Sequence, residues 1–161
     1  MKLETGDSYM LLTILLHVGT LIPILVVFWK EWWGMLRHPV LNRGLWGLLI
    51  LASLPALVGH VLGLDDGFDT GWFLGVSFII TAVLLLVTEL VSGRRGEGRL
   101  HRPGWVQALV MGVLQAFAML PGISRSGATI TGGILSGLDR RSAAKFSFMM
   151  SAPAVAGSLL L

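Results

Sequence analysis

Apolar runs of about twenty residues, separated by short charged segments, constrain the fold of this chain more than any other feature. Such runs cover residues 8–29, 44–64 and 72–91, and as helices each can cross the ~30 Å apolar layer of a membrane. Only 13% of the 161 residues are charged, whereas soluble domains contain about 25%. The sequence therefore predicts an all-α, polytopic transmembrane bundle, with residues 1–161 in one integral membrane domain.

The charged segments between these runs predict the orientation of the chain. Residues 30–43 and 92–104 are mainly basic, whereas residues 65–71 carry three aspartates and no basic residue. Because cytoplasmic loops are enriched in lysine and arginine, we expect the two basic segments to form loops in the cytoplasm and the acidic segment to form a loop outside. Membrane orientation accounts for the basic clusters, so no nucleic-acid partner is expected. The absence of cysteine excludes disulfide bonds and thiol chemistry.

Residues 105–138 are predicted to enter the membrane and to turn back toward the same side. Basic segments flank them, residues 92–104 before and residues 139–145 after, so both ends belong in the cytoplasm. As helices, the two halves on either side of Pro121–Arg125 would be about 24 Å and about 20 Å long, short of the ~30 Å core. We therefore expect a re-entrant helical hairpin with Pro121–Arg125 at its tip.

The tip, residues 120–129 with the sequence LPGISRSGAT, places an arginine at membrane depth. Arginine at this depth costs about 2.5–3.5 kcal/mol on insertion scales, so such a residue usually pairs with another group and marks a functional site. We interpret Arg125 as a phosphate-binding residue, because its planar guanidinium matches phosphate oxygens. The alternative is a helix-packing element rich in small residues, with one arginine that reaches toward the membrane surface.

The residues around this arginine predict the start of a helix that binds an anion. Pro121 and Gly122 end the first half of the hairpin, and Ser124 or Ser126 then caps the second half. The first N–H groups of a helix have no partner within it and lie at its positive dipole end, which favours an anion. The hydroxyl groups of Ser124, Ser126 and Thr129 would complete a ring of donors. The residues alone indicate an intramembrane anion or phosphate site and leave catalysis open.

His17 lies near the centre of the first apolar run. A polar side chain in this position either bonds to a neighbouring helix or lies near a substrate or ion path. Both interpretations stay open from the residues alone.

The tip sequence PGISRSGAT, Pro121–Thr129, resembles the second signature of the undecaprenyl-diphosphate phosphatase family, also called bacitracin-resistance proteins. The similarity extends to Gln115 before the motif, to GGILSGLDRRSAAKFSF at residues 132–148 after it, and to residues 15–29. It implies a multi-pass enzyme of the bacterial inner membrane with an inverted-repeat fold. The implied reaction is hydrolysis of undecaprenyl diphosphate to the monophosphate, which recycles the lipid carrier of peptidoglycan synthesis and affects bacitracin sensitivity.

The resemblance also implies roles for residues of the motif. Arg125 would bind the diphosphate with Ser124 and Thr129 as hydroxyl partners, and these three are the candidate catalytic residues. The further candidates for substrate binding are Ser126, Gly122, Gly127, Gln115 and His17.

The sequence departs from the family at both ends. The family's first signature, a glutamate-rich stretch followed by a proline–serine–serine–threonine–glycine–histidine run, should precede Gly6 and is absent. The C-terminal helices are absent too, and residues 143–161 would form an incomplete span. We therefore expect a fragment that holds one of two re-entrant loops and is inactive alone. The resemblance implies a divalent cation, Mg or Ca, with ligands outside this chain, and no metal ligand is assigned within it.

A second class of function stays open. A transporter or flippase segment could bind an anionic lipid headgroup at its broken helix without cleaving it, because transporters with inverted repeats aim helix N-termini at anions. Under the phosphatase hypothesis, the expected partners are the membrane and a polyprenyl diphosphate, and a homo-oligomer is left open.

Overall fold

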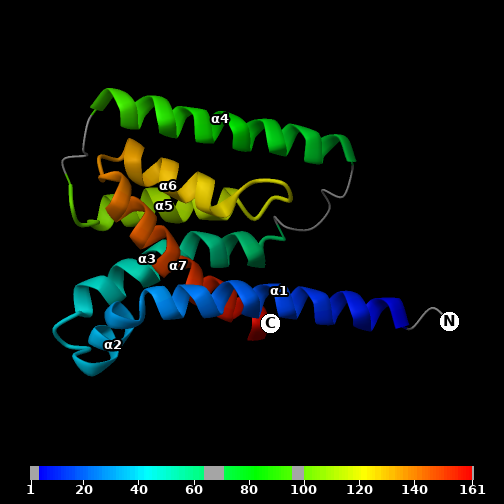
Figure 1. Cartoon of the computed structure of the whole chain (residues 1–161), viewed down its shortest axis with the longest axis horizontal. Coiled ribbons are helices and arrows are strands. Elements are labelled where there is room, and N and C mark those ends of the chain that lie inside the picture. Colours follow the sequence, from blue (N-terminus) through cyan, green and yellow to red (C-terminus); the bar gives the residue numbers. More distant parts are fainter. Residues whose placement is uncertain (1–3, 64–70, 96–99, 161) are drawn as a thin grey trace.

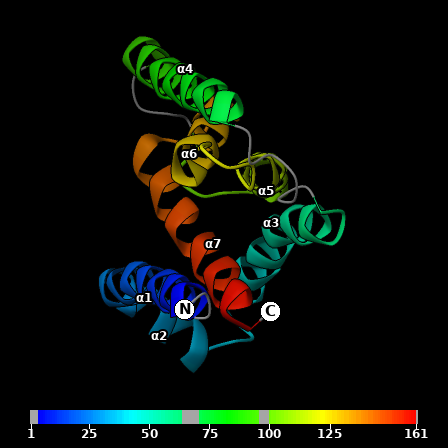
Figure 2. The ribbon, with the colours of Figure 1, turned by 90° about the vertical axis from the view of Figure 1, so that its right-hand side faces the viewer.

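A computed structural model describes residues 4–63, 71–95 and 100–160 (Figure 1). The described part is mainly helical and contains no extended strand, which confirms the all-α prediction. Figure 2 shows α4 against α6 on one side of the molecule, α1 and α2 on the other, and α7 crossing between them. The helices are α1 (Glu4–Val27), α2 (Trp29–Arg37), α3 (Arg43–Val61), α4 (Gly71–Arg95), α5 (Trp105–Phe117), α6 (Arg125–Leu135) and α7 (Arg140–Leu160).

Two helices of the described part are long and apolar enough to cross a membrane, which supports the membrane character predicted from composition. They comprise Arg43–Val61 of α3 and Trp72–Val91 of α4, and only 17% and 11% of these stretches is buried within the structure. A soluble domain buries its most apolar helices, so these exposed surfaces suit contact with lipid. The second stretch matches the predicted run, whereas α3 ends at Val61 rather than at residue 64. Residues 65–70 of the predicted acidic segment lie outside the described residues, and its last residue, Gly71, begins α4.

The prediction of a loop over residues 30–43 was wrong, because α2 occupies most of that segment. The apolar side chains recur at the i, i+3, i+4 and i+7 positions from Trp29 to Leu36, which is helical spacing. The rings of Trp29 and Trp33 stack with their centroids 5.1 Å apart, and both are exposed. Exposed tryptophans beside charged residues are typical of a helix at the membrane–water interface.

Residues 105–138 form two short helices, α5 and α6, that lie beside each other (Figure 1). Their 13 and 11 residues give lengths of about 20 Å and about 17 Å, shorter than a membrane span. The ends of the segment meet, because the N–H of Asp139 donates to the carbonyl of Leu100 at 3.0 Å. The predicted turn is therefore present. Its entry into a membrane from one side, and the inverted repeat, stay predictions.

Ion pairs join α7 to α2 and to α4 at one end of the molecule. Lys145 Nζ of α7 lies 2.7 Å from Glu31 Oε1 of α2, and Arg140 Nη2 of α7 lies 3.1 Å from Glu89 Oε2 of α4. The hydrogen bond from Lys145 lowers the pKa of the Glu31 carboxyl below its ordinary value. Exposed pairs of this kind contribute little stability, but they place the start of α7 beside the first turn of α2 and beside the C-terminal part of α4.

Asp139 directly precedes α7 and ties this helix to the segment that precedes α5. Its carboxylate accepts a hydrogen bond from the N–H of Ser142 at 2.9 Å and lies 3.0 Å from Nδ1 of His101. Burial alone would raise the pKa of Asp139, but the hydrogen bonds from Ser142 and His101 hold it below its ordinary value. The carboxylate therefore stays ionised and fixes both ends of the α5–α6 segment.

Helices α3 and α5 approach so closely that only a small residue fits between them. A Cβ atom on Gly112 of α5 would lie 2.5 Å from the carbonyl oxygen of Ala52 of α3. Ala52 is fully buried, and Met111 beside this contact belongs to a core that includes Phe146 of α7. This contact places α3 against α5 and thereby forms one wall of the cavity described below.

Candidate functional site

The turn between α5 and α6 requires glycine at one position. Gly122 has φ = +89°, a conformation that glycine adopts without strain. A Cβ atom there would also lie 2.8 Å from the Cβ atom of Ser77 on α4. Gly122 therefore lets the turn pack directly against α4. Its contribution to the site is the conformation of this turn.

Ser124 caps α6, which decides between the two serines that the sequence left open. Its Oγ accepts a hydrogen bond from the N–H of Gly127 at 3.1 Å, whereas Ser126 is exposed. Thr81 of α4 holds the same turn from outside. Its hydroxyl donates to the carbonyl of Gly122 at 3.1 Å and accepts the N–H of Ser124 at 3.0 Å. The start of α6 is thus fixed by side chains on both sides.

Thr81 belongs to a face of hydroxyl residues on α4 that no motif in the sequence marked. Ser77, Thr81 and Thr88 are four and seven residues apart, which places them on one side of the helix. The Thr88 hydroxyl lies 2.6 Å from the hydroxyl of Thr131 on α6. In the sequence, the helical spacing of these hydroxyl residues within an apolar run is the feature that indicates which face of α4 packs against α6.

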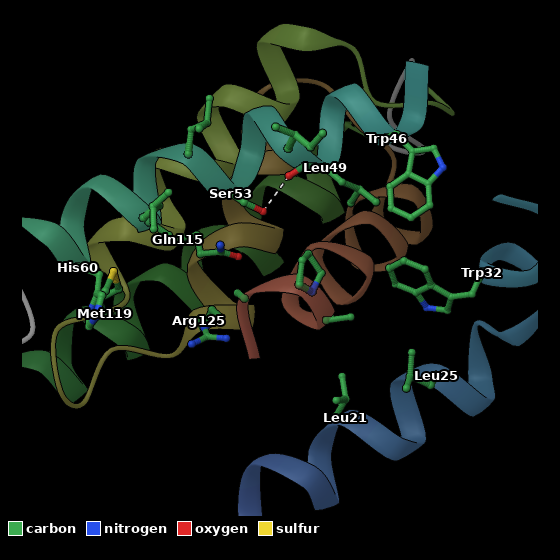
Figure 3. Close-up of a pocket in the computed structure, with 17 residues that line it drawn as sticks. Leu21, Leu25, Trp32, Trp46, Leu49, Ser53, His60, Gln115, Met119 and Arg125 are labelled. Carbon is green, nitrogen blue, oxygen red and sulfur yellow. Dashed lines mark hydrogen bonds between the residues drawn. The ribbon is translucent and has the colours of Figure 1, made fainter. Parts of the chain in front are cut away.

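Arg125, the first residue of α6, lines a cavity instead of pairing with a neighbour (Figure 3). Its side chain is largely buried. No carboxylate or carbonyl in the described part of the chain bonds to its guanidinium. Because a guanidinium stays charged and carries five N–H donors, a buried one without acceptors is unfavourable. Arg125 is therefore placed to bind an anion that enters the cavity.

The cavity has a volume of about 870 Å³ and lies between α1, α3, α5 and α7. Its wall is mainly apolar, formed by leucines of α1 and α3 and by Pro153 of α7. Figure 3 shows Arg125 and His60 at one end, and Trp32 and Trp46 at the other. Such a space suits a ligand that has an anionic end and an apolar length.

Gln115 of α5 lies in the cavity wall on the Arg125 side, and neither polar atom of its amide has a partner. The side chain is 1% exposed, and both Oε1 and Nε2 are buried without a hydrogen bond to any described residue. A buried polar group left unsatisfied costs about 1–3 kcal/mol, and few such groups occur in a native protein. A ligand with hydrogen-bonding groups at this end of the cavity would remove that cost.

The remaining motif residues lie behind the cavity wall. Thr129 is 1% exposed, and its hydroxyl donates to the carbonyl of Arg125 at 2.9 Å and lies 2.6 Å from the hydroxyl of Ser147. Gly127 is buried, and a Cβ atom on it would lie 3.1 Å from the side chain of Ser124. These residues support the backbone that carries Arg125, and their roles toward a substrate stay predictions.

Among the described side chains, His60 of α3 is the histidine that lines the cavity. No motif marked it, because its position beside Arg125 results from the packing of α3 on α5. The side chain of His17 lies outside the described residues, so its role stays a prediction.

Candidate metal ligands are scarce around the cavity. Within residues 4–63, 71–95 and 100–160, no three histidine, aspartate or glutamate side chains lie close enough to hold a metal ion. The described wall of the cavity contributes His60 and no carboxylate. Magnesium and calcium prefer carboxylate and other oxygen ligands. The described residues therefore do not fit such a cation, and no chemical step is assigned to one below.

Comparison with known proteins supports the resemblance carried by PGISRSGAT. A family model described as Bacitracin resistance protein BacA matches residues 1–161. Three relatives named undecaprenyl-diphosphatase share 39%, 41% and 34% identity with the chain, and come from Carboxydothermus hydrogenoformans, Rhodopirellula baltica and Acidiphilium cryptum. The alignments cover 96%, 98% and 98% of this chain but 59%, 60% and 61% of those relatives. The chain thus spans about three fifths of their length, and their names give no support to a transporter or flippase.

Proposed function

This chain belongs to the bacitracin resistance protein BacA family, and we propose that it forms the diphosphate-binding part of an undecaprenyl-diphosphate phosphatase. The observation that carries the proposal is the largely buried guanidinium of Arg125, which lines an apolar cavity and has no partner among the described residues. A lipid diphosphate supplies both the negative charge that would pair with Arg125 and an apolar chain that fits the cavity. Neither a soluble anion nor a neutral lipid supplies both.

The polar end of the cavity accounts for headgroup recognition. The planar fork of Arg125 donates two parallel hydrogen bonds to phosphate oxygens, and the Nε2 of Gln115 can donate another. Ser124 and Thr129, which are engaged with the backbone of α6, act by positioning Arg125. Because the cavity is mainly apolar, these charge-assisted bonds are stronger than they would be in water.

The reaction in this proposal is the hydrolysis of a phosphoric anhydride. Water adds to the terminal phosphorus, the bond from that phosphorus to the bridging oxygen breaks, and the products are the lipid monophosphate and inorganic phosphate. Arg125 stabilises the negative charge that develops on the phosphoryl oxygens during this transfer. The proposal extends to a multi-pass protein of the bacterial inner membrane. A requirement for Mg or Ca, and a homo-oligomer, stay predictions from the family.

The apolar part of the cavity accounts for the lipid. Leu21 and Leu25 of α1, Leu57 of α3 and Pro153 of α7 all line it. A cavity of about 870 Å³ accommodates the diphosphate and the first isoprene units. The rest of a long polyprenyl chain would then lie in the surrounding lipid, against the exposed apolar helices.

The release of inorganic phosphate from undecaprenyl diphosphate tests the proposed function. The purified chain in detergent micelles is mixed with the lipid, and both binding and released phosphate are measured. Binding without release is expected, because the chain is predicted to be inactive alone, and it supports the proposed diphosphate-binding role. Binding together with release would show that the chain also supplies the hydrolytic residues. A chain that neither binds the lipid nor releases phosphate contradicts the proposal.

Replacing Gln115 by leucine is expected to stabilise the free protein and to weaken ligand binding. The substitution removes an unsatisfied buried amide, so the free energy of unfolding should rise by about 1 kcal/mol and the Tm by roughly 2–4 °C. Affinity for a polyprenyl diphosphate should fall about tenfold, because a hydrogen bond to a charged oxygen is lost. Thermal unfolding and lipid binding, measured on one preparation, give both values.

Gln107→Leu is the matched control on the same helix. The amide of Gln107 is satisfied, since Nε2 donates to the carbonyl of Ser136 at 3.0 Å and Oε1 accepts the N–H of Gly104 at 3.1 Å. This variant should lower the Tm and leave the affinity for lipid unchanged. If Gln115→Leu behaves in the same way, the Gln115 amide has a structural role and does not contact the ligand.

A further inference from the structure

A second basic surface lies around the loop between α2 and α3, away from the cavity. It is an open pocket within residues 37–43, and Arg37, His38 and Arg43 are among the residues that line it. Asn42 gives the loop a defined shape, because its side-chain Nδ2 donates to the carbonyls of Gly34 at 3.0 Å and His38 at 3.1 Å. The two arginines are therefore held on either side of a structured loop.

The charges of this surface are unbalanced. Arg37 and Arg43 are exposed, and neither has an ion-pair partner within the described part of the chain. Glu31 is the single acidic residue between residues 29 and 46, and it is already bound to Lys145 at 2.7 Å. The pocket thus presents two guanidinium groups and the imidazole of His38 without a nearby free carboxylate.

The same surface exposes apolar side chains beside these charges. Val40 is 78% exposed and Leu41 is 83% exposed, and Leu36 on the last turn of α2 is 63% exposed. On the neighbouring turn, the stacked rings of Trp29 and Trp33 are exposed as well. Water solvates such a combination poorly. The boundary between lipid headgroups and acyl chains satisfies both kinds of side chain.

We propose that the surface formed by residues 37–43 binds the headgroup of an anionic phospholipid. The lipid phosphate lies between the guanidinium groups of Arg37 and Arg43, which supply fork-shaped donors. Its acyl chains lie against Val40 and Leu41. Charge and apolar exposure together select this occupant, because a zwitterionic lipid offers no net negative charge and a soluble anion offers no acyl chain. The inference is independent of the activity proposed for Arg125.

Native mass spectrometry of the chain in detergent micelles tests this binding site. The chain is titrated with phosphatidylglycerol or with phosphatidylcholine, and the lipid-bound fraction is measured. The wild-type chain should prefer phosphatidylglycerol by about 30-fold, since each of the two arginines near a membrane surface contributes about a fivefold attraction to anionic lipid. The double variant Arg37→Gln/Arg43→Gln should lose this preference. Leu41→Asn should weaken binding of both lipids.

The control variant Arg102→Gln/Arg141→Gln removes the same charge at the same end of the molecule. Both residues are exposed and lie outside the pocket, so the preference should be unchanged. Equal binding of the two lipids by the wild-type chain would overturn the proposal. An equal loss in both double variants would show a general charge effect and overturn it as well. Displacement of the lipid by millimolar glycerol phosphate would assign the pocket to soluble anions instead.

Discussion

Replacing Arg125 by glutamine is expected to lower the affinity of the chain for a polyprenyl diphosphate by about 100-fold or more. The substitution removes the charge and the paired donors that face the cavity, and it leaves the start of α6 capped by Ser124. Arg125→Lys should retain the positive charge and lose the two parallel hydrogen bonds. Its affinity for the diphosphate should therefore lie between those of the wild type and Arg125→Gln. Fluorescence anisotropy of a labelled farnesyl diphosphate in detergent measures all three affinities.

Arg141→Gln is the control for net charge in this comparison. Arg141 is exposed in the first turn of α7 and does not line the cavity. Its replacement should leave the affinity for the diphosphate unchanged. If Arg125→Gln and Arg141→Gln weaken binding to the same extent, the attraction is a property of the whole basic surface and the cavity is not the binding site.

Replacing Gly112 by alanine is expected to destabilise the fold more than any other small substitution on α5. The new Cβ atom would lie 2.5 Å from the Ala52 carbonyl oxygen and 2.9 Å from its Cα atom, so α3 and α5 must move apart. Overpacking against backbone should lower the free energy of unfolding by about 2–3 kcal/mol and the Tm by roughly 4–12 °C. Thermal unfolding followed by circular dichroism measures the change.

Gly47→Ala on α3 is the control for this substitution. A Cβ atom at Gly47 meets nothing within 4 Å. Alanine is a better helix former than glycine by about 1 kcal/mol, so this variant should be as stable as the wild type or more stable. Equal destabilisation by the two variants would contradict the close packing of α3 on α5.

The features that follow local rules could be predicted from the sequence. Long apolar runs identified α3 and α4, and basic segments at both ends of residues 105–138 indicated that this segment turns back. The helix breakers Pro121 and Gly122 located the turn between α5 and α6. The spacing of the tryptophans in residues 29–36 also follows a local rule and indicates helix α2, whereas the charges of this segment are equally typical of a loop.

The cavity could not be predicted, because residues distant in the sequence form it. His60 reaches the Arg125 end only when α3 packs on α5, and this contact depends on Gly112 and Ala52. Thr81 reaches the turn only when α4 lies against α6. The motif identified Arg125 and Ser124 together. The absence of a partner for Arg125 among the described residues, in contrast, becomes visible only in the folded chain.

Photolabelling with a farnesyl diphosphate that carries a diazirine on its prenyl chain tests the central claim most directly. The claim is that the lipid occupies the cavity with its diphosphate at Arg125. Adducts should then map to Leu21–Leu25 of α1, to Leu49–His60 of α3 and to residues 152–154 of α7. They should disappear in Arg125→Gln and in an excess of unlabelled lipid. Adducts confined to the exposed face of α4, at the same level in wild type and Arg125→Gln, would contradict the claim.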